Sequence, residues 1–148
     1  MIFVFIILIL ALCYFLYCLV FYLFQHKILF KQTKFSSDYK FEYEFEFEEL
    51  FWKTNDGNTI NGLWFKVPES KGVVVFSHGN TGHMGRSGNF FKRIKDYGYD
   101  LVLYDYRGYG KSTGKPTQEN FYSDSLVVVN WVFERYKSKR IVYHGLSM

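Results

Sequence analysis

The residues with the clearest chemical potential are Gly145-Leu146-Ser147, which follow the apolar run at residues 141–143. This order predicts a strand, a sharp turn and a serine, as in the first part of a G-x-S-x-G motif. Such a turn holds the serine hydroxyl above the end of a sheet, where it can attack an acyl carbon. The predicted chemistry is acyl transfer, with Ser147 as the nucleophile.

Acyl transfer also needs two hydrogen-bond donors for the oxyanion that develops on the substrate. One is the backbone N–H of the residue after the nucleophile, here Met148, and the other comes from a loop after an earlier strand. That loop reads His78-Gly79-Asn80, so we expect the Asn80 N–H to be the second donor. Gly79 gives the backbone freedom to turn this N–H toward the site, and His78 is expected to be a structural hydrogen-bonding residue.

Three apolar segments must position these loops. Residues 73–76, 101–104 and 141–143 are apolar on both faces, which is typical of buried strands in a parallel sheet. Helical spacing separates them, around residues 88–97 and again after Thr117, which is expected to be an N-cap. Because such crossovers are right-handed, the loops after the three strands converge on one edge of the sheet. The sequence therefore predicts an α/β fold with a mostly parallel sheet.

The segment before these strands predicts an antiparallel hairpin. Residues 41–48 alternate aromatic and acidic side chains, which predicts a strand with one buried face. Residues 55–58 read Asn-Asp-Gly-Asn, a turn signal, and residues 59–67 are expected to form the returning strand. We interpret the acidic side chains as the solvated face of an edge strand and not as a cation site.

The N-terminal segment predicts a membrane anchor. Residues 2–24 contain no charged side chain, and a helix of that length spans about 34 Å, against a hydrocarbon core of about 30 Å. The stretch is too long for the apolar part of a signal peptide, and no small-residue cleavage site follows it. We expect an anchor over residues 1–24 that contacts the lipid bilayer through residues 2–24, a connector over 25–39 and an α/β domain over 40–148.

The charges predict the orientation and exclude one class of partner. Lys27, Lys31 and Lys34 follow the anchor, whereas only the amino terminus precedes it, so a single-pass protein would keep its body in the cytoplasm. The net charge of +4 comes from scattered side chains, so no nucleic acid partner is expected. Cys13 and Cys18 both lie in the anchor, so we expect no disulfide or thiol chemistry in the body.

Three motifs in this order resemble the α/β-hydrolase superfamily: F-S-H-G-N-T-G at residues 76–82, D-Y-R-G-Y-G-K-S at 105–112 and G-L-S at 145–147. They are most similar to the membrane-anchored, serine-aminopeptidase-like branch, and residues 114–117 are also similar to related protein depalmitoylases. The resemblance covers about residues 47–148, together with the position of the anchor. It implies that Ser147 is the nucleophile, that Asn80 and Met148 line the oxyanion hole, and that Asp105 and Arg107 support the adjacent loop.

One part of that family's pattern is missing. The catalytic triad of the family runs Ser, Asp or Glu, and then His along the chain, but only Met148 follows Ser147 here. We therefore expect the chain to be the N-terminal half of the hydrolase sheet, truncated before the acid and base. Alone, we expect it to be inactive and either marginally stable or prone to aggregate in solution. None of the earlier histidines is a convincing base. His144 should point away from the serine, and only His83 is not excluded by its position in the sequence.

No cofactor or metal is expected. Gly110-Lys111-Ser112 resembles the end of a phosphate-binding loop, but Asp105 stands where that motif needs its first glycine. The histidines of the body have neither thiols nor clustered carboxylates beside them, so we interpret them as hydrogen-bonded or solvated side chains.

Two functional hypotheses remain. In the first, the parent protein is a membrane-anchored serine hydrolase that cleaves an ester, thioester or amide of a small acyl-type substrate through an acyl-enzyme at Ser147. In the second, the chain is a non-catalytic membrane-tethered remnant or interaction stub in which Ser147 has no role.

Overall fold

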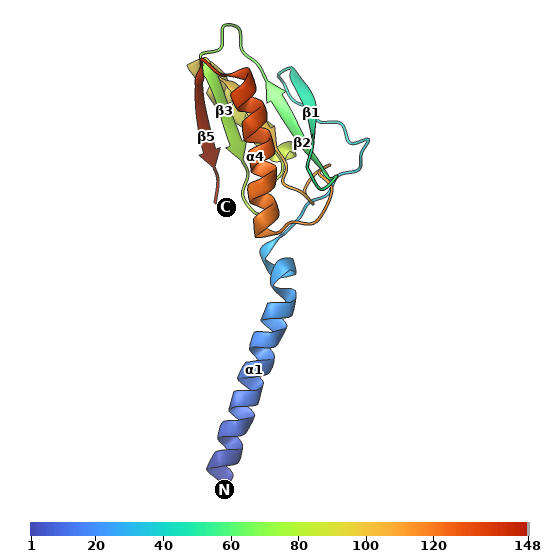
Figure 1. The fold of residues 1–148 in the computed structure, drawn as a ribbon, viewed down its shortest axis with the longest axis vertical. Coiled ribbons are helices and arrows are strands. Elements are labelled where there is room, and N and C mark those ends of the chain that lie inside the picture. Colours follow the sequence, from blue (N-terminus) through green and yellow to red (C-terminus); the bar gives the residue numbers. More distant parts are fainter. Residues whose placement is uncertain (148) are drawn as a thin grey trace. The chain divides into compact units, whose positions relative to one another are not determined.

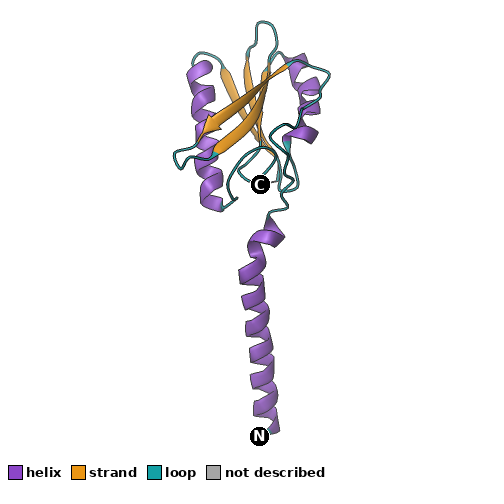
Figure 2. Ribbon diagram, turned by 90° about the vertical axis from the view of Figure 1, so that its right-hand side faces the viewer, coloured by secondary structure: helices purple, strands orange, loops and turns teal. Residues whose placement is uncertain are grey.

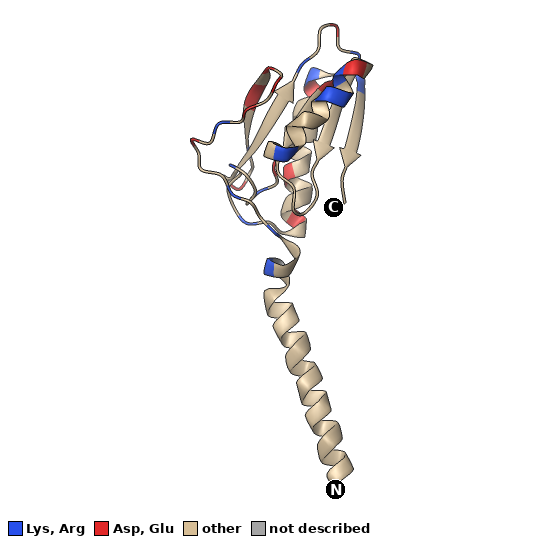
Figure 3. Ribbon diagram, turned by 180° about the vertical axis from the view of Figure 1, so that it is seen from behind, with Lys and Arg blue, Asp and Glu red and all other residues tan. Residues whose placement is uncertain are grey.

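The computed structural model describes residues 1–147, without the side chain of residue 26. The chain divides into two compact units, Met1–Lys31 and Gln32–Met148. The first unit consists of helix α1 (Ile2–Leu29), which continues beyond the predicted end of the anchor at residue 24 (Figure 1). Its segment Ile2–Gln25 is long and apolar enough to span a membrane. Figure 3 shows that this helix carries no charge until its C-terminal end.

The second unit is built on a mixed five-stranded sheet with the order β1-β2-β4-β3-β5. The strands are β1 (Phe47–Lys53), β2 (Thr59–Phe65), β3 (Gly72–Ser77), β4 (Asp100–Tyr104) and β5 (Arg140–Gly145). β2 pairs antiparallel with β1 and β4, whereas β3 pairs parallel with β4 and β5. The α/β fold with a parallel part preceded by a hairpin is therefore confirmed.

Helices cover both faces of this sheet (Figure 2). α4 (Gln118–Arg135) lies on one face, where Val73 and Val75 of β3 pack in the same cluster as Val128 and Val132. The other face carries four short helices: α2 (Met84–Ser87), η1 (Gly88–Phe90), α3 (Phe91–Ile94) and η2 (Lys95–Tyr97). The alternate β3 residues 74 and 76 pack on that side. Period-two alternation thus supplies β3 with two buried faces.

The prediction of a strand over residues 41–48 is wrong for most of its length, because β1 begins only at Phe47. β1 pairs with β2 from Phe47 opposite Phe65, where β2 ends, so residues 41–46 have no strand beside them in this ladder. The alternation still fixes which side chains are buried. Phe41 is in the core, and Tyr43 and Phe45 pack against it.

The two predicted helices differ in outcome. The expected helix over residues 88–97 is broken into short α and 3-10 turns that begin earlier, at Met84, and end at Gly98, whose φ of 80° is left-handed. The helix after Thr117 is confirmed: the Thr117 side chain accepts a hydrogen bond from the Asn120 N–H at 3.2 Å. This bond satisfies one of the free N–H groups of the first turn.

Candidate active site

Three loops meet at the carboxyl edge of the parallel strands. A Cβ atom added to Gly79, after β3, would lie 3.3 Å from the Cβ atom of Ser147 and 3.0 Å from the carbonyl oxygen of Leu146, both after β5. The hydroxyl of Tyr109, in the loop after β4, donates a hydrogen bond to Oδ1 of Asn80 at 2.9 Å. The expected convergence of the loops on one edge is therefore observed, and a side chain at position 79 would press closely on the serine.

The backbone of Ser147 is strained. Its φ is 72°, in the left-handed region that residues other than glycine rarely adopt, at a cost of about 1–3 kcal/mol. Directly before it, the Leu146 N–H donates to the Ser77 carbonyl oxygen at 3.0 Å, so the contact between the β3 and β5 ends continues up to the turn. The ladder holds the base of the turn. The left-handed backbone of Ser147 directs the chain away from the end of the sheet, and the serine is exposed there.

A cavity of about 670 Å³ lies beside Ser147. Its wall also includes Asn80, whereas Met148, the other predicted oxyanion-hole residue, lies outside the described residues. The lining residues are Phe76, His78, Gly79, Asn80, Thr81, Gly82, Arg86, Ser87, Asn89, Phe90, Arg93, Leu146 and Ser147. The volume suits a small organic ligand, for which protein pockets of about 300–1,000 Å³ are usual.

His78, which lines the cavity, and Asp105 are buried against each other. Nε2 of His78 lies 3.2 Å from Oδ1 of Asp105, and its Nδ1 lies 2.8 Å from the carbonyl oxygen of Gly79. The same carboxylate accepts a hydrogen bond from the Met84 N–H at 2.7 Å. Asp105 therefore connects the loop after β4 to the start of the short helices, and His78 lies between that carboxylate and the loop of Asn80.

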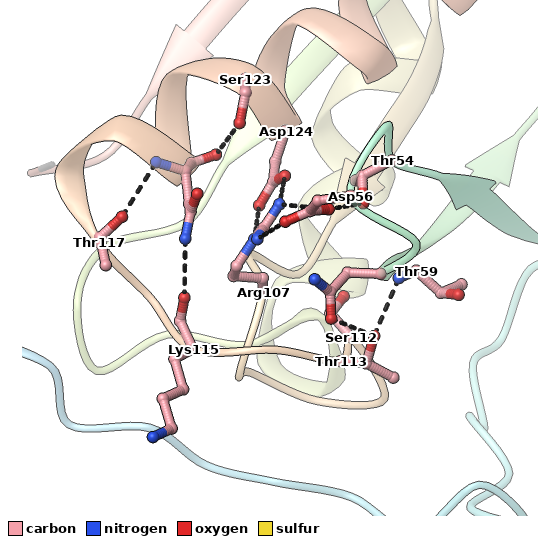
Figure 4. A network of polar contacts seen from close by, with 12 residues as sticks. Thr54, Asp56, Thr59, Arg107, Ser112, Thr113, Lys115, Thr117, Ser123 and Asp124 are labelled. Atoms are coloured by element: carbon pink, nitrogen blue, oxygen red, sulfur yellow. Dashed lines mark hydrogen bonds and ion pairs between the residues drawn. The ribbon is translucent and has the colours of Figure 1, made fainter.

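Arg107 braces the loop after β4 and is not among the described residues that line the cavity. Figure 4 shows its side chain between Asp124 and Asp56. Its Nη2 lies 2.5 Å from Asp124 of α4, and its Nη1 lies 2.6 Å from Asp56 of the hairpin turn. Hydrogen bonding to Asp124 raises the pKa of the Arg107 guanidinium. Hydrogen bonds from Arg107, and then from Thr54, hold the pKa of the Asp56 carboxyl well below its usual range. One buried guanidinium thus joins the hairpin, the loop and α4.

A network of hydroxyl groups ties together the ends of three strands, and sequence reasoning missed it. Ser77 Oγ lies 2.7 Å from the Tyr104 hydroxyl and donates to the Tyr143 hydroxyl at 2.8 Å. The Tyr104 hydroxyl lies 2.9 Å from Ser125 Oγ of α4. Burial raises the pKa of Tyr104, so its hydroxyl stays protonated and can donate. The signal was a polar group at the end of each apolar strand.

Among the described side chains, no histidine is hydrogen-bonded to Ser147. The His83 ring packs edge-on against the Phe35 ring, with 5.0 Å between the ring centroids. Burial lowers the pKa of His83. The His144 ring stacks on Phe76 at 5.3 Å, on the face of the short helices. In residues 1–147, no group of three or more His, Cys, Asp or Glu side chains could hold a metal ion. The described histidines therefore pack against neighbours other than the serine.

The sequence also gave no reason to connect Arg86 and Arg93 with the site. Both lie in the short helices and line the cavity that holds Ser147. Their connection to the serine depends on how residues 84–97 fold over the sheet, which no local motif indicates.

Comparisons with known proteins identify the family of this chain. Residues 68–148 match the family described as serine aminopeptidase, S33. Human alpha/beta hydrolase domain-containing protein 17B is 36% identical over 100 residues, which are 65% of this chain and 35% of that protein. The lysophosphatidylserine lipase ABHD12 of Macaca fascicularis is 28% identical over 103 residues, which are 67% of this chain and 25% of that protein.

Solved structures show the same fold. The esterase Pf2001 of Pyrococcus furiosus superposes with a TM-score of 0.65 at 25% identity, over 81% of this chain and 47% of the esterase. The chain thus spans about a quarter to a third of the length of these sequence relatives and about half of this esterase. Because the S33 match covers more than half of the chain, the protein belongs to the serine aminopeptidase-like (S33) family of α/β-hydrolases.

Proposed function

We propose that the protein is a membrane-anchored serine hydrolase that cleaves an ester, thioester or amide through an acyl-enzyme at Ser147. The observation that carries the proposal is the backbone of Ser147, which has a φ of 72° beside Gly79, on the wall of the cavity that Asn80 also lines. In this fold the nucleophilic serine stands in a strained turn at the carboxyl edge of the parallel sheet, which is the position of Ser147.

In this proposal Ser147 Oγ attacks the acyl carbon, and the backbone N–H groups of Asn80 and Met148 stabilise the resulting oxyanion. Collapse of the tetrahedral intermediate expels the alcohol, thiol or amine and leaves the acyl group on Ser147, from which water then removes it. His78, Gly79, Asp105 and Arg107 support the site. Their contacts join its loops to α2, α4 and the hairpin.

The proposed reaction also needs a general base and an acid that orients this base. Their order in this family places both after the serine. Because the chain spans about a quarter to a third of its sequence relatives, we expect both groups in the portion of the relatives that it does not span. On this account residues 1–148 supply the nucleophile and the oxyanion hole but not the complete triad.

The anchor and the relatives favour an acylated substrate at a membrane. Ile2–Gln25 could span the bilayer once, and the lysines that follow it favour a cytoplasmic body. One relative is named as a lysophosphatidylserine lipase, which makes a lipid ester a reasonable small acyl substrate. Protease treatment of intact cells tests the orientation: a cytoplasmic body stays protected until the membrane is opened, and digestion in intact cells would contradict this orientation.

Hydrolysis of p-nitrophenyl esters by the protein expressed from its own gene, in its own membranes, tests the activity. We expect turnover that Ser147→Ala reduces by 10³-fold or more, because removal of a triad member leaves only residual catalysis. Ser123→Ala, which removes an exposed hydroxyl in α4, is the matched control and should leave turnover unchanged. Equal turnover by Ser147→Ala and the wild type, or no turnover by either, would favour the alternative of a non-catalytic interaction stub.

A further inference from the structure

We propose that the cavity beside Ser147 receives an acyl compound that carries an anionic phosphate or carboxylate group, and that Arg86 and Arg93 bind this group. The inference deepens the proposed function, because it takes Ser147 to be the nucleophile of the same cavity. It names a property of the substrate and is argued from the side chains that line the cavity.

The two arginines lie on two short helices that η1 separates. Arg86 belongs to α2 and Arg93 to α3, and both line the cavity together with Ser147. Asn89, between them in the sequence, also lines the cavity and adds an uncharged donor. One side of the cavity is thus rich in hydrogen-bond donors.

Among the described residues, no carboxylate balances the charge of this cavity. Their share of the lining contains two arginines and no aspartate or glutamate. Within residues 1–147, the salt bridges of the body involve other cations, including Arg107, and neither Arg86 nor Arg93 pairs with a carboxylate. An anion is the complement that this wall lacks.

The rest of the lining fits the remainder of such a molecule. Phe76, Phe90 and Leu146 supply apolar surface beside the serine, which suits the carbon chain of an acyl group or of a glycerol backbone. Guanidinium groups bind phosphate or carboxylate in a planar, two-pronged geometry, and an arginine is suited to either anion. A cavity of about 670 Å³ can hold a headgroup together with the start of a chain.

Binding of short-chain ethers tests the inference without requiring turnover. The full-length protein is held in nanodiscs of zwitterionic phosphatidylcholine, and three water-soluble probes are titrated: 1-O-hexylglycerol, its phosphate monoester and its carboxymethyl ether. An ether bond resists an ester hydrolase, so the affinities report recognition alone. We expect both anionic probes to bind roughly tenfold more tightly than the neutral one, from a contribution of about fivefold or less per exposed arginine. This preference should shrink as the ionic strength rises.

Variants assign the preference to the two arginines. The double variant Arg86→Gln/Arg93→Gln should bind the three probes equally, and Arg86→Lys/Arg93→Lys should retain part of the preference. Lys92 lies next to Arg93 in α3 but is not among the described lining residues. Lys92→Gln should therefore keep the full preference. A preference for the phosphate alone or for the carboxylate alone identifies the natural group, provided that the glutamine variants remove it. Equal affinities in the wild type, or a preference that survives in the double variant, would overturn the inference.

Fluorophosphonate labelling of the same samples separates this inference from the proposed function. Labelling of Ser147 without anion preference would contradict the role of the arginines and leave the hydrolase proposal intact. Arginine-dependent anion binding without labelling would do the opposite: it would support the binding site and contradict the nucleophile.

Discussion

Arginines in two regions beside the same sheet edge differ in their burial and in their ion pairs. In the loop after β4, Arg107 is 4% exposed and pairs with the fully buried carboxylate of Asp124 and with Asp56. On the cavity wall, Arg86 and Arg93 are exposed and, within residues 1–147, pair with no carboxylate. A charge that pairs within the protein holds its structure together, whereas an unpaired charge beside the proposed nucleophile Ser147 is available to a ligand.

The backbones of the two regions differ in the same way. The loop after β4 is fixed by hydrogen bonds to the hairpin and to the loop after β3, including Asp105 N–H to Asn61 and Tyr109 to Asn80. The turn at Ser147 is held by a bond of Leu146 to Ser77 and carries a strained φ. We infer that the loop after β4 is the rigid support of the site and that the backbone strain is confined to the turn at Ser147.

The largest effect expected from this comparison is on stability. Arg107→Ala would leave Asp124 buried without its partner, and breaking a buried ion pair in this way costs about 3–5 kcal/mol. We expect urea unfolding of the full chain in detergent micelles to show this loss of free energy. Lys92→Gln, which removes an exposed cation on α3, serves as the control and should change little. A loss below about 1 kcal/mol in Arg107→Ala would mean that the brace is not structural.

A second prediction concerns the close approach of Gly79 to the serine. In Gly79→Ala the new methyl group would press on the Leu146 carbonyl at 3.0 Å and on the Ser147 Cβ at 3.3 Å, so the turn must move by a few tenths of an ångström. We expect the rate of fluorophosphonate labelling to fall roughly tenfold, because small displacements of reacting groups are costly. Gly57→Ala strains a hairpin turn with open space around it and should leave labelling unchanged. Equal rates for Gly79→Ala and wild type would show that Gly79 does not shape the site.

A smaller effect is expected at the start of α4. Thr117→Ala removes the side-chain oxygen that accepts the Asn120 N–H, and loss of an N-cap costs about 1 kcal/mol. Urea unfolding measures this loss, and Thr117→Ser should preserve most of the stability. If alanine and serine were equally stable, the cap would not contribute.

The smallest expected effect is a change in acid sensitivity at Asp56. Arg107 holds the pKa of this carboxyl well below its usual value, so the folded state favours the ionised form. The resulting stability is present above the unfolded pKa of about 4 and is lost as the pH falls from there toward the folded pKa. The difference in unfolding free energy between wild type and Asp56→Asn should therefore be constant near neutral pH and shrink below about pH 4. A difference that grew with acidity would contradict this sign.

Apolar patterning was enough to predict the sheet and the loops around the candidate site. The runs at residues 73–76, 101–104 and 141–143 became β3, β4 and β5, because strands buried on both faces need continuous apolar sequence. The alternation at 41–48 predicted the buried side chains but not the secondary structure. An alternating pattern records which face is covered, whereas a strand also needs a partner, and β2 ends before it reaches those residues.

Contacts between distant parts of the chain could not be predicted from the sequence. Arg86 and Arg93 reach the cavity only because the segment 84–97 folds as short helices over the sheet, beginning where Met84 bonds to Asp105. The contact of Ser77 with Tyr104 and Tyr143 likewise depends on strand register, in which residue 77 lies opposite residue 104. Neither relationship has a local signal, since the partners are far apart in the chain.

The most direct test of the central claim is to map the adduct that a fluorophosphonate probe forms on the protein expressed from its own gene. After labelling in native membranes, peptide mass spectrometry identifies the modified residue. We predict one adduct, on Ser147, because that hydroxyl is held by a strained turn beside Gly79 and the loop of Asn80. An adduct on a different residue, or an unmodified Ser147 in membranes whose other serine hydrolases are labelled, would contradict it.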